Sequence, residues 1–300
     1  MKSLKKVLII IITLILIFVG FIVINIFLMP MHTRYDITNE EYPYWHINQN
    51  FTLQIEEGEV KRKVVVAIVD TGTDTVDFPY PNILEGKNIL NQNNITTDRH
   101  GHGKVISHLV ASPTLGINKY ADILPVKVRK MMRDNPKHVS MGIRWAVDHG
   151  ADIINLSIGR EKTKYNKHEG YFDGVDYALK KGVLLIASSG TTGNSVYYPA
   201  AIDGVISVGG IDKNHKYHSN IDPEKIDIFA VDTKEKVSSS FPTAIVSGAV
   251  SLVMTLDDSI SAHKAMEIIL ETADVENIDG KEVKILNVDR AIQFIRKKEK

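Results

Sequence analysis

The sequence predicts a three-layer αβα fold, in which helices cover both faces of a mostly parallel central sheet, preceded by one N-terminal transmembrane helix. The first observation is that apolar, β-branched runs such as KVVVAIVDTG (63–72) alternate along the chain with amphipathic segments. Strands buried on both faces of a parallel sheet have such continuous apolar sequences. The second observation is an apolar stretch near the N-terminus that is long enough to cross a bilayer.

The N-terminal stretch is interpreted as a signal anchor. Residues 7–29 are apolar apart from three isolated positions, and about 20 apolar residues span the hydrocarbon core of a membrane. The lysine-rich start MKSLKK precedes this stretch and acidic residues follow it, so the positive-inside rule places residues 1–6 in the cytoplasm. The alternative is a cleaved signal peptide, but no small-residue cleavage motif follows. We therefore expect a single-pass protein of the cell membrane with an extracytoplasmic domain.

The rest of the chain divides into a tether and one domain. Residues 30–58 are polar and mixed in composition, whereas alternating strand and helix patterns fill residues 59–300. The segments predicted as strands are 63–72, 151–159, 183–190 and 204–210. Those predicted as helices are 138–150, 171–182, a long segment that begins at Ser240, and one that Ser261 caps. Strands that alternate with helices indicate a parallel sheet with helices on both faces.

The composition excludes several classes of function. The 36 basic and 36 acidic residues cancel, so no excess of positive charge indicates binding to nucleic acid. The chain has no cysteine, which excludes disulfides, thiolate catalysis and zinc–thiolate sites. No metal ion or other cofactor is predicted, and the sequence does not indicate an oligomeric state.

Three polar residues occupy positions where catalytic groups are expected. Asp70 ends the first predicted strand, His102 lies between glycines ahead of a helical pattern, and Ser240 begins the long apolar helix. The order Asp, His, Ser is one in which the acid–base–nucleophile triad occurs. In a triad, a neutral imidazole takes the serine proton and a buried carboxylate fixes the imidazole tautomer. We therefore predict that these three residues are catalytic.

Motifs in the same order make the chain resemble the subtilisin-like serine proteases, or subtilases, from about residue 61 to residue 293. VAIVDTGTD resembles the aspartate segment of the family, HGKVISHLVA its histidine segment, and SSSFPTAIVSGAVSL its serine segment. The register of the serine segment selects Ser240 from three consecutive serines. Further matching segments are IRWAVDHGADIINLSIG, GVLLIASSG, YYPAAIDGVISVGG and ILNVDRAIQ. The resemblance implies a serine endopeptidase that hydrolyses peptide bonds through an acyl-enzyme.

The resemblance also implies where a peptide substrate binds. Its backbone is expected to pair as an added strand with one edge of the sheet, and one wall of the specificity pocket holds the residue before the scissile bond. The residues assigned to the edge are Ser157, Ile158 and Gly159, and those assigned to the wall are Ser188, Ser189 and Gly190. Tyr197 falls where the family often has small residues on the pocket floor. A filled pocket predicts a preference for small residues such as alanine or glycine.

The sequence departs from the family pattern at the oxyanion hole. Thr191 stands where the family usually has an asparagine, and Asn194 is the alternative side-chain donor. The backbone N–H of Ser240 is the second expected donor. Ser238 and Ser239 replace the usual glycine and threonine, and we expect them to be loop and cap residues. The segment 109–128 is too short for the calcium loop of the family, so no calcium site is predicted.

Other interpretations of these residues were weighed. Asp70 lies in the D-T-G motif of aspartic proteases, but these enzymes need two carboxylates and the chain has no second such motif. His100 and His102 could form a metal pair, but no third ligand has convincing spacing. His108 is expected to be packed or solvated. The departures from the family leave a second hypothesis, a catalytically weak or inactive homologue that binds peptides or a partner. An active enzyme is expected to process a dedicated secreted or leader-bearing peptide.

Overall fold

The structure is a computed structural model, which describes residues 53, 55–76, 78, 80, 82–131, 133–163, 168–232, 237–278 and 280–298. The predicted signal anchor and most of the tether lie outside these residues. Within the described part of the chain, no helix is both long and apolar enough to cross a membrane.

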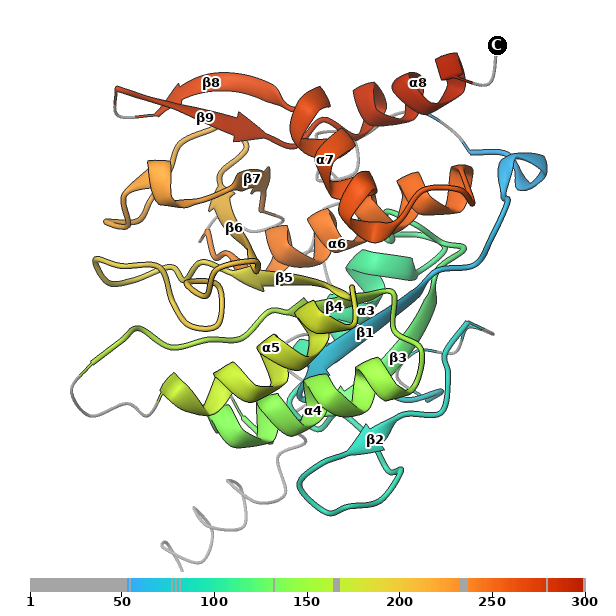
Figure 1. Cartoon of the computed structure of the whole chain (residues 1–300), viewed down its shortest axis with the longest axis vertical. Helices are drawn as coiled ribbons and strands as arrows, with labels where there is room; N and C mark the ends of the chain where they lie inside the picture. The colour runs from blue at the N-terminus through green and yellow to red at the C-terminus, as the bar shows by residue number, and fades with distance from the viewer. Residues whose placement is uncertain are drawn as a thin grey trace, which may run out of the picture.

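One mostly parallel sheet forms the centre of the molecule (Figure 1). Its strand order is β2-β3-β1-β4-β5-β6-β7-β9-β8, and β8 and β9 form an antiparallel pair at one edge. The bounds are β1 Val65–Asp70, β2 Lys87–Asn88, β3 Asp122–Lys127, β4 Ile153–Leu156, β5 Leu184–Ser188, β6 Ile206–Ile211, β7 Ile228–Val231, β8 Asp274–Ile278 and β9 Lys281–Ile285. The predicted parallel α/β architecture is confirmed. The sequence analysis did not predict β2, β3, β7 or the β8–β9 hairpin.

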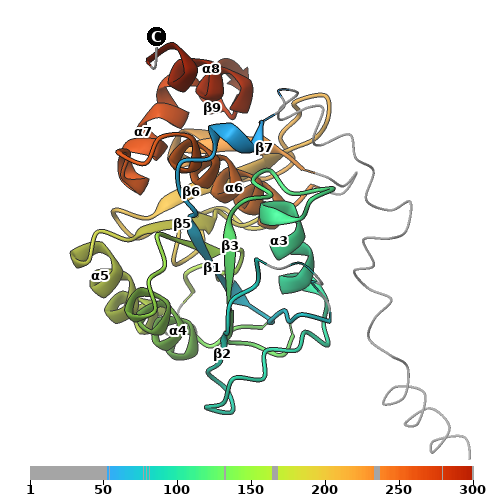
Figure 2. The ribbon, with the colours of Figure 1, turned by 90° about the vertical axis from the view of Figure 1, so that its right-hand side faces the viewer.

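Helices cover both faces of this sheet, as Figure 2 shows. On one side lie α4 (Pro136–Asp148) and α5 (Phe172–Lys180), with the 3₁₀ turn η3 (His168–Tyr171) before α5. The other side carries α3 (His102–Ala111), α6 (Ser240–Leu256), α7 (Ala262–Thr272) and α8 (Val288–Lys298). The remaining 3₁₀ turns are η2 (Glu57–Glu59) and η4 (Pro223–Lys225). Ser261 caps α7 as predicted, because its side chain accepts the N–H of Lys264 at 3.2 Å.

The two faces of β1 explain why its sequence is apolar throughout. Val66 and Ile68 belong to the core shared with α3 and α6, whereas Ala67 and Val69 belong to the core shared with α4 and α5. Successive side chains of a strand point to opposite faces, so a strand covered on both sides buries every residue. Each fully buried Val or Ile side chain stabilises the fold by about 1.5–3 kcal/mol. The apolar part of β1 ends at Asp70, which is itself buried.

The described residues of the predicted tether contact the domain. Leu53 and Ile55 pack against the core on the α6 side, and the backbone N–H of Leu53 donates to Asp289 at 3.0 Å. Glu59 forms an ion pair with Arg296 of α8, with 2.7 Å between Oε1 and Nε. These contacts attach the start of the domain to its last helix.

Candidate active site

Asp70 and His102 are in direct contact at the carboxyl edge of the sheet. Asp70 is the last residue of β1, and His102 is the first residue of α3. The His102 Nδ1 atom lies 3.0 Å from each carboxylate oxygen of Asp70, and both side chains are buried. A ring nitrogen in this position donates its proton to the carboxylate, which leaves the other ring nitrogen as a proton acceptor.

The loop before α3 holds these two residues against each other. Thr71 Oγ1 accepts the N–H of Gly103 at 2.8 Å and donates to Asp98 at 2.9 Å, so the end of β1 is bound to the start of α3. Asp98 also accepts the backbone N–H of Gly101 and of Lys104 at the helix N-terminus. A carboxylate at this end of a helix is favoured by the helix dipole.

Residue 103 must be glycine for this approach to occur. A Cβ atom at Gly103 would lie 2.3 Å from the carbonyl oxygen of Gly72, closer than any van der Waals contact allows. The glycine that follows the histidine in the sequence motif therefore has a steric reason. It permits the close packing of α3 on the segment after β1 that brings His102 to Asp70.

A third buried group, Arg129, completes the surroundings of Asp70. Arg129 follows β3, and its Nη2 atom lies 3.1 Å from each carboxylate oxygen of Asp70. Burial alone would raise the pKa of Asp70, but the positive charge of Arg129, the neighbouring His102 and the N–H of Thr71 together lower this pKa far below its usual range. Asp70 is therefore ionised at neutral pH.

Ser240 begins α6 and contacts the end of β4. Ser157 Oγ donates to the carbonyl oxygen of Ser240 at 2.7 Å, and Ser240 Oγ donates to the carbonyl oxygen of Ser157 at 3.4 Å. The ring of the next residue, Phe241, lies 6.2 Å from the His102 ring, centre to centre. Ser240, His102 and Asp70 thus come from three segments that are distant in the sequence. Asp70 contacts His102 directly, and Ser240 contacts Ser157 just after β4.

Ser239 is the N-cap residue of α6, as predicted, although its side chain makes no capping hydrogen bond. Instead, Ser239 Oγ lies 2.6 Å from Ser188 Oγ and accepts the backbone N–H of Gly190 at 3.1 Å. This hydroxyl joins the serine loop (residues 237–240) to the end of β5. The loop assignment of Ser238 is correct, and its N–H donates to Asp232 at 2.5 Å.

Thr191 and Asn194 are the two predicted side-chain donors of the oxyanion hole, and Thr191 lies beside the serine loop. Its Oγ1 accepts the backbone N–H of Ser239 at 3.3 Å, so the hydroxyl proton of Thr191 can donate elsewhere. Asn194 is exposed, and its backbone N–H donates to Glu161 at 3.0 Å. These contacts favour Thr191 as the side chain adjacent to Ser240.

Tyr197 covers the predicted pocket wall. Its ring lies directly against Gly190, where an added Cβ would come within 2.5 Å of the ring carbon Cδ1. Gly190 has a φ of +95°, in the region that favours glycine. The Tyr197 N–H donates to the carbonyl oxygen of Ser189 at 2.9 Å, which fixes the tyrosine to the wall.

The predicted substrate edge lies between Ser240 and this tyrosine segment. Ser157 and Ile158 are buried, and a Cβ at Gly159 would lie 2.8 Å from the carbonyl oxygen of Tyr198. The next residue, Arg160, exchanges two backbone hydrogen bonds with Tyr198, at 2.9 and 2.8 Å. The edge is therefore bounded at Arg160 by an antiparallel bridge within the chain.

Comparison with known proteins decides the family. The family model described as the subtilase family matches residues 61–291, which include Asp70, His102 and Ser240.

The chain belongs to the subtilase family.

Individual subtilases are distant in sequence. The chain is 27% identical to the cell wall-associated protease of Bacillus subtilis over 302 residues, covering 85% of this chain and 33% of that protein. It is 25% identical to subtilisin DY of Bacillus licheniformis over 240 residues, covering 72% of this chain and 86% of that protein. The chain thus spans about a third of the length of the cell wall-associated protease.

Solved structures show the same fold. The epidermin leader peptide processing serine protease of Staphylococcus aureus superposes with a TM-score of 0.70 at 19% identity, covering 86% of this chain and 83% of that chain. A likeness at this identity extends to the fold alone. The chain is accordingly a subtilisin-like serine peptidase by family and by fold.

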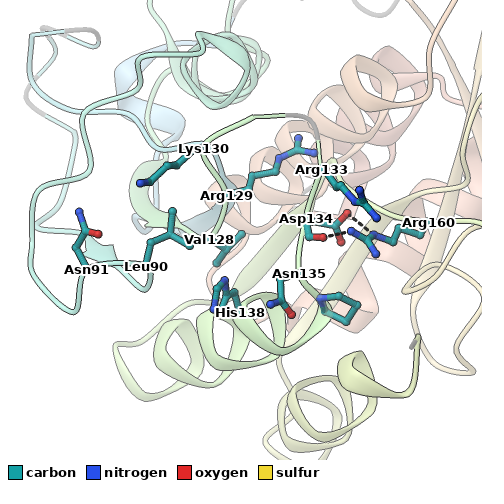
Figure 3. A pocket seen from close by; sticks show the side chains of 11 residues that line it. Leu90, Asn91, Val128, Arg129, Lys130, Arg133, Asp134, Asn135, His138 and Arg160 are labelled. Carbon is teal, nitrogen blue, oxygen red and sulfur yellow. Dashed lines mark hydrogen bonds and ion pairs between the residues drawn. The ribbon is translucent and has the colours of Figure 1, made fainter. Parts of the chain in front are cut away.

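A cleft of about 720 Å³ lies beside Arg129, which contacts Asp70. Arg129, Lys130, Arg133 and Arg160 contribute positive charge to its lining, and Asp134 contributes a carboxylate (Figure 3). Asp134 is already bound, because Arg160 Nε donates to it at 3.2 Å and the buried Tyr171 hydroxyl donates to its other oxygen. Burial, followed by the charge of Asp134, raises the pKa of Tyr171 far above its usual value. The cleft therefore has an excess of positive charge next to the catalytic edge.

Two further histidines, His100 and His108, lie in this region. His108 is packed as predicted, with its ring 4.8 Å from that of Phe78. His100 is buried, and burial, reinforced by the charge of His102, lowers its pKa. No cluster of three or more metal-ligating side chains occurs among the residues that the structure describes.

Sequence analysis missed Arg129. The residue directly follows the apolar run ILPVKV, a position at which an arginine is usually exposed to solvent. The signal that could have identified it is its register. In the sheet, β3 pairs with β1 and Lys127 stands opposite Asp70, so a residue just after Lys127 reaches the same edge as Asp70.

Proposed function

We propose that this subtilase is a serine endopeptidase in which Asp70, His102 and Ser240 form the catalytic triad. His102 takes the proton of the Ser240 hydroxyl as the oxygen attacks the carbonyl carbon of a peptide bond. The same proton then passes to the leaving amine, and water releases the acyl group from Ser240 by the reverse sequence. Asp70 holds the imidazole in the required tautomer and stabilises the imidazolium.

The observation that carries this proposal is the buried contact between Asp70 and His102. Its two 3.0 Å distances orient the ring so that the Nε2 atom faces away from the carboxylate. Ser240 stands at the N-terminus of α6, where the helix dipole favours the negative charge that develops on the reacting oxygen. The backbone N–H of Ser240 and the Thr191 hydroxyl are the proposed oxyanion donors.

Peptide hydrolysis by the full chain in detergent tests the triad. We expect Ser240→Ala and His102→Ala each to lower kcat by about 10⁶-fold and Asp70→Asn by about 10⁴-fold. Because the residues act as one unit, the double variant of Ser240 and His102 should be no worse than either single variant. Ser238→Ala is the matched control in the same serine loop and should keep most activity. If the fold-losses in kcat of the two single variants multiplied in the double variant, the result would contradict the triad.

The alternative function is that of a peptide-binding module with little or no turnover. Two observations favour it: Ser240 Oγ donates to the carbonyl oxygen of Ser157, and threonine occupies the usual asparagine position at residue 191. Under this alternative the wild type hydrolyses no peptide bond at any pH, whereas binding of a substrate-like peptide is retained. A peptide library assayed for both cleavage and binding separates the two functions.

We further propose that the protein is anchored in the cell membrane and acts outside it on a dedicated secreted or leader-bearing peptide. The apolar stretch 7–29 after a lysine-rich start supports the anchor. The fold likeness to an epidermin leader peptide processing protease and the tyrosine that covers the specificity pocket support a narrow substrate range. Deletion of residues 7–29 should move the protein from the membrane fraction to the medium or the soluble fraction. Peptides at the cell surface should differ between cells with and without Ser240.

A further inference from the structure

We propose that Arg129 is a positioning residue for the Asp70–His102 pair and that its charge sets the lower pH limit of activity. The inference rests on the proposed triad. It adds a residue that neither the family motifs nor the sequence pattern assigns, and it makes the pH dependence of this enzyme a property of one side chain.

A single nitrogen of Arg129 contacts three parts of the site. The Arg129 side chain is 2% exposed, and its Nη2 atom lies 3.1 Å from both oxygens of Asp70. The same atom lies 3.2 Å from His102 Nδ1 and 3.4 Å from the carbonyl oxygen of Ser157. The Arg129 side chain thus joins the end of β1, the start of α3 and the substrate edge after β4.

This geometry restricts the carboxylate. Arg129 and His102 both donate to Asp70, and each reaches both of its oxygens. Rotation of the carboxylate would break both sets of contacts, so Asp70 keeps the plane that orients His102. A guanidinium is charged at all relevant pH values, which keeps the buried Asp70 ionised beside it.

The same guanidinium opposes protonation of His102. With Nδ1–H directed at Asp70, a second proton on the ring would place an imidazolium beside an arginine cation at 3.2 Å. Two like charges at this separation repel each other strongly in a buried site. In this arrangement the charge of Arg129 opposes a second proton on the His102 ring, whereas the charge of Asp70 favours it.

The other groups that face His102 were considered from each element. Asp98 and His100 stand in the loop before α3, where Asp98 accepts the backbone N–H of His100. Lys127, at the end of β3, donates to the carbonyl oxygens of Thr71 and Thr97. From α6 and from the end of β4 the neighbouring side chains, Phe241, Ser240 and Ser157, are uncharged. Arg129 is thus the cation that contacts the Asp70–His102 pair directly.

The test is the pH dependence of kcat/KM on an uncharged peptide for Arg129→Gln and Arg129→Met. Removal of the arginine charge stabilises the imidazolium of His102. On acidification, the variants should therefore lose activity at a higher pH than the wild type does. We expect the acid limb of this profile, where activity falls on acidification, to move upward by about three pH units, the size expected for a unit charge about 4 Å away at an effective dielectric of about 20. Arg129→Lys keeps the charge, so its acid limb should stay near that of the wild type while kcat falls.

Arg133→Met is the matched control. Arg133 lines the same cleft but its side chain is exposed, and Figure 3 shows it beside the Asp134–Arg160 pair. Its removal lowers the net charge of the cleft by the same amount and should leave the acid limb in place. An equal shift in this control would overturn the proposal, because the effect would then belong to the cleft as a whole. A uniform loss of activity at every pH in Arg129→Gln, without a shift, would also overturn it.

A second measurement does not depend on turnover. NMR titration of the His102 ring in Ser240→Ala, with and without Arg129→Gln, should show protonation of the ring at higher pH when Arg129 is absent. Thermal unfolding verifies that each variant is folded. If the ring titrates as expected but the wild type cleaves no peptide, the proposed function fails while the role of Arg129 stands. If wild-type activity depends on Ser240 but the ring titration is unchanged, the role of Arg129 fails alone.

Discussion

Ser157 and Ser240 are joined by a reciprocal pair of hydrogen bonds. Ser157 Oγ donates to the carbonyl oxygen of Ser240 at 2.7 Å, and Ser240 Oγ donates to the carbonyl oxygen of Ser157 at 3.4 Å. The first bond is short and attaches α6 to the segment after β4. The second is long, so the Ser240 hydroxyl is held weakly and can turn to the imidazole when substrate binds.

Removal of the shorter bond should therefore misplace the nucleophile. We expect Ser157→Ala to lower kcat about tenfold, because small displacements of reacting groups have large effects on rate. The free energy of unfolding should fall by about 1 kcal/mol, the typical net contribution of one hydrogen bond. Kinetics on a peptide substrate and denaturant unfolding measure both. Ser207→Ala is the control: its buried hydroxyl bonds Asp227 at 2.7 Å and not a residue of the proposed site, so its loss should affect stability and leave kcat unchanged.

The Thr191 hydroxyl is expected to stabilise the oxyanion. Thr191→Val keeps the shape and removes the hydroxyl, and we expect kcat to fall by about 10²-fold, the lower end of the effect of losing one oxyanion donor. Thr191→Ser keeps the hydroxyl that accepts the Ser239 N–H and should retain most activity. Thr191→Asn should raise kcat, because an amide is a better-placed donor. A fall in kcat on Thr191→Asn would contradict the assignment.

The Tyr197 ring is expected to limit the specificity pocket. Tyr197→Ala removes the ring that lies against Gly190, so the preference before the scissile bond should widen from alanine and glycine to leucine and phenylalanine. Cleavage of a peptide library measures this change. Tyr197→Phe keeps the ring and loses only the hydroxyl that contacts Thr192, so its preference should match the wild type. A wild-type preference for leucine or phenylalanine would refute the filled pocket.

Ionisation of Asp70 should make stability depend on pH. The pKa of Asp70 is lowered in the folded state, so the unfolded chain binds this proton first as pH falls. The stabilisation is complete above the unfolded pKa of about 3.9 and is lost as pH falls below it. At neutral pH we expect Asp70→Asn to destabilise the protein by about 3 kcal/mol, because the buried Arg129 loses its counter-charge.

Unfolding by urea between pH 7 and pH 2 measures this dependence. The difference in stability between the wild type and Asp70→Asn should narrow as pH falls below about 4. Asp173→Asn is the control, since Asp173 forms an exposed pair with Arg144 and should show little difference at any pH. A constant difference for Asp70→Asn would mean that ionisation of Asp70 does not contribute to stability.

Local sequence patterns were sufficient for the central parallel strands β1, β4, β5 and β6, and the motif order predicted the contact of Asp70 with His102. Residues 64–69 are all apolar, which fits a strand buried on both faces and places the Asp70 carboxylate at its end. The hairpin of β8 and β9 escaped prediction because its residues alternate between exposed and buried, unlike the buried strands of the centre. A strand was therefore predicted correctly where its own residues formed a continuous apolar run.

Arg129 and Ser239 could not be predicted in the same way. The proximity of Arg129 to Asp70 depends on the order β3-β1-β4 and on the register between β3 and β1, which no single segment encodes. Ser239 resembles a helix cap in sequence, but the end of β5 offers its hydroxyl two partners, Ser188 and Gly190. Contacts between elements decide both roles.

Labelling of the full chain with a fluorophosphonate, followed by mass mapping of the modified peptide, tests the central assignment most directly. The reagent traps a serine that an adjacent imidazole activates. We predict one label, on Ser240, that is absent in Ser240→Ala, strongly reduced in His102→Ala and unchanged in Ser238→Ala. A label on another serine, or equal labelling after loss of His102, would contradict the proposed triad.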